Sequence, residues 1–113
     1  MQIQVNTDNH IEGGEELTRE VESVVEGALG RFSDWLTRVE IHLSDENSSS
    51  KSGGDDKRCV MEARTEGQQP VSVSHQGATT DQALKGCIKK LARVLDDTKG
   101  RLYDPKGNTS FAG

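Results

Sequence analysis

Four basic side chains fall within nine residues of one another in the last third of the chain: Lys85, Lys89, Lys90 and Arg93. Successive residues of an α-helix are rotated by about 100°, so Lys85, Lys89 and Arg93 form one stripe and Lys90 lies on its flank. Clustered ammonium and guanidinium groups can bind the phosphate oxygens of a nucleic acid, and such contacts position a protein without reading sequence. The same pattern is typical of an ordinary solvated helix face. On these residues alone, that second interpretation is the simpler one.

The element that must position these cations is a helix predicted over residues 79–102. Its apolar residues recur at spacings of three and four, as they do on the buried face of an amphipathic helix. Thr79 and Gln82 have the spacing of a capping box, which predicts where the helix begins. The predicted buried face lies well away from the basic stripe and consists of Ala83, Leu84, Cys87, Ile88, Leu91, Leu95 and Leu102.

Apolar residues alternate in four other segments and recur with helical period in a fifth, which predicts four strands and a first helix. The order β-α-β-β-β-α predicts an α+β fold. Each strand has one apolar face, so two helices should pack on one face of a four-stranded sheet and leave the other face to water. The three later strands are joined by turns and should form an antiparallel meander. The predicted strands are 1–6, 38–44, 58–65 and 71–73, and the first helix is 15–32.

The length of 113 residues is that of one domain. We expect residues 1–102 to form this domain. Residues 44–57 are rich in Ser, Gly and Asp and contain no apolar residue, which predicts a mobile loop between two strands. Residues 103–113 contain Pro and Gly without an apolar pattern, so we expect a disordered tail.

Charge is unevenly distributed along the chain, whose net charge is −5. Residues 1–46 hold 3 basic and 11 acidic side chains, residues 47–80 hold 4 of each, and residues 81–113 hold 7 basic and 4 acidic ones. The acidic balance argues against indiscriminate nucleic-acid binding, which grows with the number of phosphates neutralised. It leaves room for one basic face to dock at a defined RNA site.

Composition excludes several classes of protein. No run of about 18 apolar residues predicts a membrane span, and the N-terminus lacks the pattern of a signal peptide. Cys59 and Cys87 are far apart in the sequence and fall on predicted core faces. We interpret them as buried thiols in a reducing cytoplasm.

Residues suited to metal or catalytic chemistry are scattered. His10, His42 and His75 lie singly in different elements, so we interpret them as surface residues and not as metal ligands. Neither Gly13-Gly14 nor Gly53-Gly54 has the Gly-Lys-Ser/Thr context of a phosphate-binding loop. No nucleophile motif or Cys–His arrangement is present, so we predict no enzymatic activity and no cofactor.

Three segments resemble a known protein family: the opening strand MQIQV, the segment GALGRFSDWLTRVEIHL and the stretch ALKGCIKKLARVL. The last stretch is the most specific, with Ala83-Leu84, then Ile88, then Lys90-Leu91-Ala92-Arg93-Val94-Leu95. Together with the order of elements, these segments make residues 1–102 similar to the ribosome hibernation-promoting factors. That family is also called the ribosomal subunit interface or sigma-54 modulation proteins.

The resemblance implies a fold similar to double-stranded-RNA-binding domains. It also implies docking on the small ribosomal subunit, in the channel used by messenger and transfer RNA. Such a cytoplasmic protein would block translation and preserve idle ribosomes in stationary phase or stress. By this resemblance, contacts to rRNA phosphates are expected from Lys85, Lys89, Lys90 and Arg93. We expect a monomer with no cofactor, no membrane contact and no small-molecule substrate.

The chain departs from the family pattern at several points. Asp96 and Asp97 stand where more lysine is expected, and Asp81-Gln82 precedes Ala83 where the family often has a tyrosine. The loop at 44–57 is longer than usual. We expect a short form, without the C-terminal dimerisation domain of the long family members.

Two other functions stay open. A protein-interaction module of the same fold would use the acidic first helix or an exposed strand edge, without ribosome contact. A small enzyme with an unrecognised site is the third and weakest interpretation. The acidic residues of the first helix, for which a solvated face is the simpler interpretation, are Glu15, Glu16, Glu20, Glu22 and Glu26. The isolated arginines that would extend the basic surface are Arg31, Arg38 and Arg64.

Overall fold

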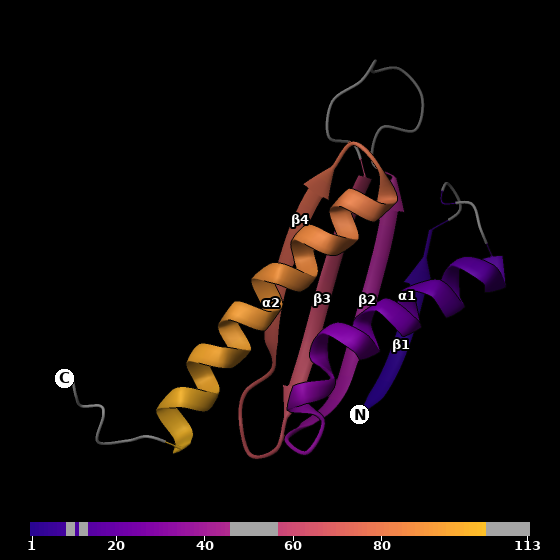
Figure 1. Ribbon diagram of the computed structural model, residues 1–113. Helices are drawn as coiled ribbons and strands as arrows, with labels where there is room; N and C mark the ends of the chain where they lie inside the picture. The colour runs from indigo at the N-terminus through magenta and orange to yellow at the C-terminus, as the bar shows by residue number, and fades with distance from the viewer. Residues whose placement is uncertain (9–10, 12–13, 46–56, 104–113) are drawn as a thin grey trace.

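The computed structural model describes residues 1–8, 11, 14–45 and 57–103, with side chains described through Gly100. The order of elements is β-α-β-β-β-α, which confirms the predicted α+β fold (Figure 1). A short 3₁₀ turn, η1 (Gly30–Phe32), follows the first helix. The elements are β1 (Gln2–Thr7), α1 (Gly14–Leu29), β2 (Leu36–Asp45), β3 (Lys57–Thr65), β4 (Val71–Gly77) and α2 (Thr80–Tyr103).

The four strands form one mixed sheet in the order β1-β2-β3-β4. Strands β2, β3 and β4 pair antiparallel, as predicted for the meander. Strand β1 pairs parallel with β2, and α1 supplies the crossover that a parallel pair requires. Both helices cover the same face of the sheet, with α2 over β3 and β4 (Figure 1).

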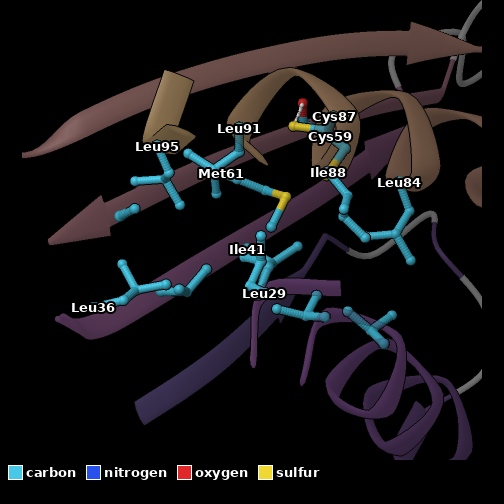
Figure 2. Close-up of a cluster of buried hydrophobic side chains, with 14 of the residues drawn as sticks. Leu29, Leu36, Ile41, Cys59, Met61, Leu84, Cys87, Ile88, Leu91 and Leu95 are labelled. Atoms are coloured by element: carbon cyan, nitrogen blue, oxygen red, sulfur yellow. Dashed lines mark hydrogen bonds between the residues drawn. The ribbon is translucent and has the colours of Figure 1, made fainter. Parts of the chain in front are cut away.

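The hydrophobic core lies between the sheet and the two helices. In Figure 2, Met61 of β3 lies between Leu91 of α2 and Ile41 of β2, and Ile41 lies beside Leu29 of α1. Alternate residues of β2 and β3 turn toward this layer because successive side chains of a strand point to opposite faces. The predicted buried face of α2 is confirmed from Ala83 to Leu95. The core residues contributed by the first helix are Val21, Val25 and Leu29.

The helix boundaries follow from local chemistry. The backbone N–H of Gln82 donates to Thr79 Oγ1 at 3.0 Å, and the backbone N–H of Ala78 donates to Gln82 Oε1 at 3.1 Å. These bonds satisfy donors that a helix start leaves unpaired, so α2 begins at Thr80. The first helix ends at Leu29, earlier than predicted, and its final turn tightens into η1.

Several element ends differ from the predictions. Asp45 pairs in register with Lys57, and their side chains lie 3.5 Å apart, so both ends of the predicted loop 44–57 belong to strands. Residues 46–56 of that loop lie outside the described residues. Strand β4 continues to Gly77 because pairing with β3 extends past its two valines. Helix α2 includes Tyr103, the first residue of the predicted tail, and residues 104–113 are not described.

Candidate nucleic-acid interface

The outward side of α2 carries the four cations singled out in the sequence, and all four are exposed. Three of them, Lys89, Lys90 and Arg93, line an open groove of about 810 Å³. The helix positions them because its opposite face is fixed in the core by Leu91 and Leu95. The other residues that line this groove are His75, Gly86, Ala92, Asp96 and Asp97.

Lys90 has a fixed place at the edge of the groove. Its Nζ donates to the carbonyl oxygen of Ser74 on β4 at 2.8 Å. An ammonium group has three donors, so this bond orients the side chain and leaves hydrogen-bonding capacity for an anion. Within the described residues, Lys89 and Arg93 have no ion-pair partner.

Lys85 does not join the other three cations in the groove. Its Nζ lies 3.3 Å from Asp81 Oδ2, one turn earlier on the helix, and both side chains are 64% exposed. Asp81 contributes to a different groove, between α1 and the start of α2. The structure therefore separates Lys85, which has a local anionic partner, from the groove of Lys89, Lys90 and Arg93.

The two acidic departures from the family pattern lie in the groove itself. Asp96 Oδ2 accepts a hydrogen bond from Arg31 Nη2 at 2.8 Å, which brings a further arginine to this side of the molecule. Asp97 lines the groove beside the cations. With Arg31 offsetting Asp96, the remaining balance is three cations against one carboxylate. The groove is therefore a positive site that Asp97 weakens.

Arg38 and Arg64 do not extend this surface. They pair in register on β2 and β3, where their neighbours Val39 and Ala63 face the core, so both arginines lie on the open face of the sheet. Arg38 donates to Glu40 at 2.8 Å and also contacts Gln2 and Gln4. The hydrogen bond from Arg38 holds the pKa of Glu40 below its ordinary value. Arg38 is thus engaged by neighbours on the face away from α2.

The sequence interpretation missed one residue of the groove. His75, interpreted as a surface histidine, is half-buried between β4 and α2 and lies against Gly86. The available signal was a glycine inside a strong helical pattern, which is disfavoured unless a close contact needs it. His42 is exposed on the open sheet face, 3.6 Å from Glu40, and His10 lies outside the described residues. No group of three or more potential metal ligands occurs within residues 1–8, 11, 14–45 and 57–103.

The acidic helix α1 presents a separate feature. A groove of about 200 Å³ lies between α1 and the first turn of α2, with Leu17 and Val24 half-buried in it. Glu20 and Asp81 line it as well. Along α1, the exposed carboxylates are Glu15, Glu16, Glu20 and Glu26. Neither helix, over its described residues, is long and apolar enough to cross a membrane.

Two solved structures resemble this fold. The N-terminal domain of Protein Y from Thermus thermophilus superposes with a TM-score of 0.62 at 19% identity, covering 80% of this chain and 91% of that one. A ribosomal subunit interface protein from Coxiella burnetii gives a TM-score of 0.64 at 16% identity, covering 88% of this chain and 99% of that one. At these identities the likeness shows the fold alone.

Sequence comparison is more specific about the family. No curated protein sequence matches this chain significantly. A family model described as sigma 54 modulation protein / S30EA ribosomal protein matches residues 3–103. This range includes both helices and all four strands, except for Gln2, the first residue of β1. The match also spans Lys89, Lys90 and Arg93, the cations of the groove. The chain belongs to the sigma 54 modulation protein / S30EA ribosomal protein family.

Proposed function

We propose that this protein is a ribosome-associated factor that binds the small ribosomal subunit through the outward side of α2. By occupying the messenger- and transfer-RNA channel in the cytoplasm, it inhibits translation without chemistry. The observation that carries this proposal is the groove in which Lys89, Lys90 and Arg93 gather, on a chain of this family. One structural neighbour, the ribosomal subunit interface protein from Coxiella burnetii, supports the same partner.

The electrostatics of the groove suit RNA phosphates. The three cations stand on one helix that is anchored in the core, so binding must order mainly their side chains and not the backbone that carries them. Each phosphate neutralised by lysine or arginine releases counterions, which makes affinity fall steeply with salt. A net charge of −5 keeps the rest of the molecule from adding non-specific contacts, so binding depends on this face.

Occlusion is tested by competition on programmed small subunits. Purified protein is added to small subunits that carry labelled messenger RNA and transfer RNA, and retention of each label is measured. Displacement of either label in proportion to bound protein is the expected result. Simultaneous stable binding of protein, messenger RNA and transfer RNA would contradict occlusion and place the docking site elsewhere on the subunit.

The groove between α1 and α2 favours a second candidate function, a protein-interaction module. Leu17 and Val24 leave apolar surface in it, and Glu20 and Asp81 add carboxylates at its border. By charge complementarity, its occupant would be a lysine- or arginine-rich protein segment with one apolar anchor side chain.

This second function is tested with a labelled peptide that carries one leucine among lysines and arginines. Binding that is lost in Glu20→Lys and kept in Lys89→Glu supports the interaction module. If both variants bind the peptide equally weakly and salt abolishes this binding, the groove between α1 and α2 is not a specific site for the peptide.

A further inference from the structure

Gly86 makes room for one specific side chain. A Cβ atom built at position 86 would lie 2.0 Å from Cδ2 and 2.3 Å from Nε2 of His75, so the imidazole occupies the space that any larger residue would fill. Among the described residues, Gly27 in α1 and Gly100 in α2 have no such neighbour within 4 Å. Glycine is disfavoured inside a helix. Its presence at position 86 is explained because the His75 ring occupies the space that a Cβ atom would need.

The imidazole ring of His75 lies in the same groove as Lys89, Lys90 and Arg93. His75 lines that groove, and the carbonyl of the preceding residue, Ser74, accepts the hydrogen bond from Lys90. In register, His75 lies beside Cys59 on β3, so its strand presents it on the helix-covered face. Among the described residues, no hydrogen bond or ion pair engages the imidazole. A planar ring without a protein partner is thus held among three cations.

This juxtaposition suits an unpaired nucleotide better than a continuous duplex. Proteins that bind single-stranded RNA or bulges use cationic side chains to contact the phosphates of the RNA. They also carry aromatic or histidine rings on which the unpaired bases stack. Duplex RNA keeps its bases stacked inside and presents mainly phosphates and sugars. We propose that His75, seated on Gly86, stacks against an unpaired base while the neighbouring cations hold its phosphates. This proposal rests on the proposed function and names the class of RNA that the groove takes.

The test compares two labelled RNA hairpins of equal length, one fully paired and one with a single-nucleotide bulge. Affinities are measured by fluorescence anisotropy for the full chain, and thermal unfolding confirms that each variant is folded. His75→Ala removes the ring, and His75→Phe keeps an aromatic surface without ring nitrogens. Gly86→Ala displaces the ring without altering charge. Gly100→Ala is the matched control in the same helix, since no described atom lies within 4 Å of its added Cβ.

The wild type should bind the bulged hairpin more tightly than the paired one. His75→Ala should lose about 5- to 150-fold in affinity for the bulged RNA, the range for one stacked base, and little for the paired RNA. Gly86→Ala should behave like His75→Ala, whereas His75→Phe and Gly100→Ala should behave like the wild type. A folded His75→Ala that binds both hairpins like the wild type would overturn the proposal.

A charge-reversed variant distinguishes the stacking role of His75 from the proposed binding of ribosomal RNA through the groove. If Lys89→Glu/Arg93→Glu loses RNA binding while His75→Ala keeps it, the stacking role fails and the basic groove stands. If the charge-reversed variant binds both hairpins like the wild type, the groove is not the RNA site and both proposals fail.

Discussion

The ammonium of Lys90 lies 2.8 Å from the carbonyl oxygen of Ser74, and this hydrogen bond joins the basic side of α2 to the edge strand β4. The contact places Lys90 beside His75 and gives the groove one wall from the helix and one from the sheet. Lys85, one turn earlier on the helix, has a different partner, because its ammonium lies near Asp81. Residues that share a cluster in the sequence therefore have different neighbours in the fold.

Lys90 and Lys85 should contribute unequally to RNA binding. Lys90→Met keeps the apolar stem and removes a charge from the groove. Its affinity for small-subunit RNA should fall, and the slope of log K against log salt should become shallower by about 0.7–0.9, the value for one phosphate contact. Lys85→Met is the matched control and should change the slope little, because its ammonium is outside the groove and near Asp81. Equal slopes for the two variants would show that the groove does not select among the lysines.

Asp97 should weaken the interaction that the groove provides. Asp97 lines the groove, and among the described residues it has no arginine partner of the kind that Asp96 has in Arg31. Replacing Asp97 with asparagine removes this carboxylate. We expect Asp97→Asn to bind RNA about 2- to 5-fold more tightly at low salt, the effect of one exposed charge pair. Asp34→Asn, an exposed change outside the groove, should leave affinity unchanged. Weaker binding by Asp97→Asn would assign the carboxylate a direct role in the contact.

Thr65 carries a buried hydroxyl that should lower stability. Its side chain is buried at the end of β3, and within the described part of the chain Oγ1 has no hydrogen-bond partner. Thr65→Val keeps the shape and should raise the free energy of unfolding by about 1–3 kcal/mol, measured by urea denaturation. Thr37→Val is the comparison, since the Thr37 hydroxyl donates to the Arg64 carbonyl at 2.9 Å. A loss of stability in Thr65→Val would mean that the hydroxyl is satisfied.

The two cysteines should resist alkylation in the folded protein. Cys59 and Cys87 are fully buried and face each other between β3 and α2, and Cys87 Sγ donates to the Cys59 carbonyl at 3.4 Å (Figure 2). A side-chain hydrogen bond between the two thiols, together with burial, raises the pKa of the Cys59 thiol. At pH 8, iodoacetamide should modify both thiols only after unfolding in urea. Rapid modification in buffer, followed by mass spectrometry, would show that α2 opens from the sheet.

The same pKa shift predicts how stability depends on pH. A thiol whose pKa is raised by folding stays protonated in the native state while it ionises in the unfolded chain. Its contribution to stability is complete at neutral pH and declines above about pH 8.5, where free thiols ionise. The free energy of unfolding should therefore fall more steeply above that pH for the wild type than for Cys59→Ala. Parallel pH profiles for the two proteins would contradict the shift.

Much of the fold follows from local pattern, and α2 shows why. Its apolar spacing predicts the buried face, and Thr79 with Gln82 predicts the helix start, because both signals lie within a few turns of one segment. The end of β4 was harder to predict. Ser74, His75 and Gln76 lack an apolar pattern, and they are strand residues only because β3 offers a register for them.

The candidate groove was predicted in part. Helical projection identifies Lys89 and Arg93 as neighbours, yet it carries no information about which flank of α2 meets β4. That flank is set by the packing of the core, so the separate neighbours of Lys85 and Lys90 emerge only from the structure. The contact of His75 with Gly86 joins two elements, and no spacing within either one encodes it.

The most direct test of the central claim is co-sedimentation of the purified protein with small ribosomal subunits across a salt series. The wild type is compared with Lys89→Glu/Arg93→Glu, and with Glu20→Lys as the variant of the acidic helix. The account predicts salt-sensitive binding by the wild type and by Glu20→Lys, and loss of binding by the folded charge-reversed variant. Absence of wild-type binding at low salt, or equal binding by the charge-reversed variant, would contradict docking through α2.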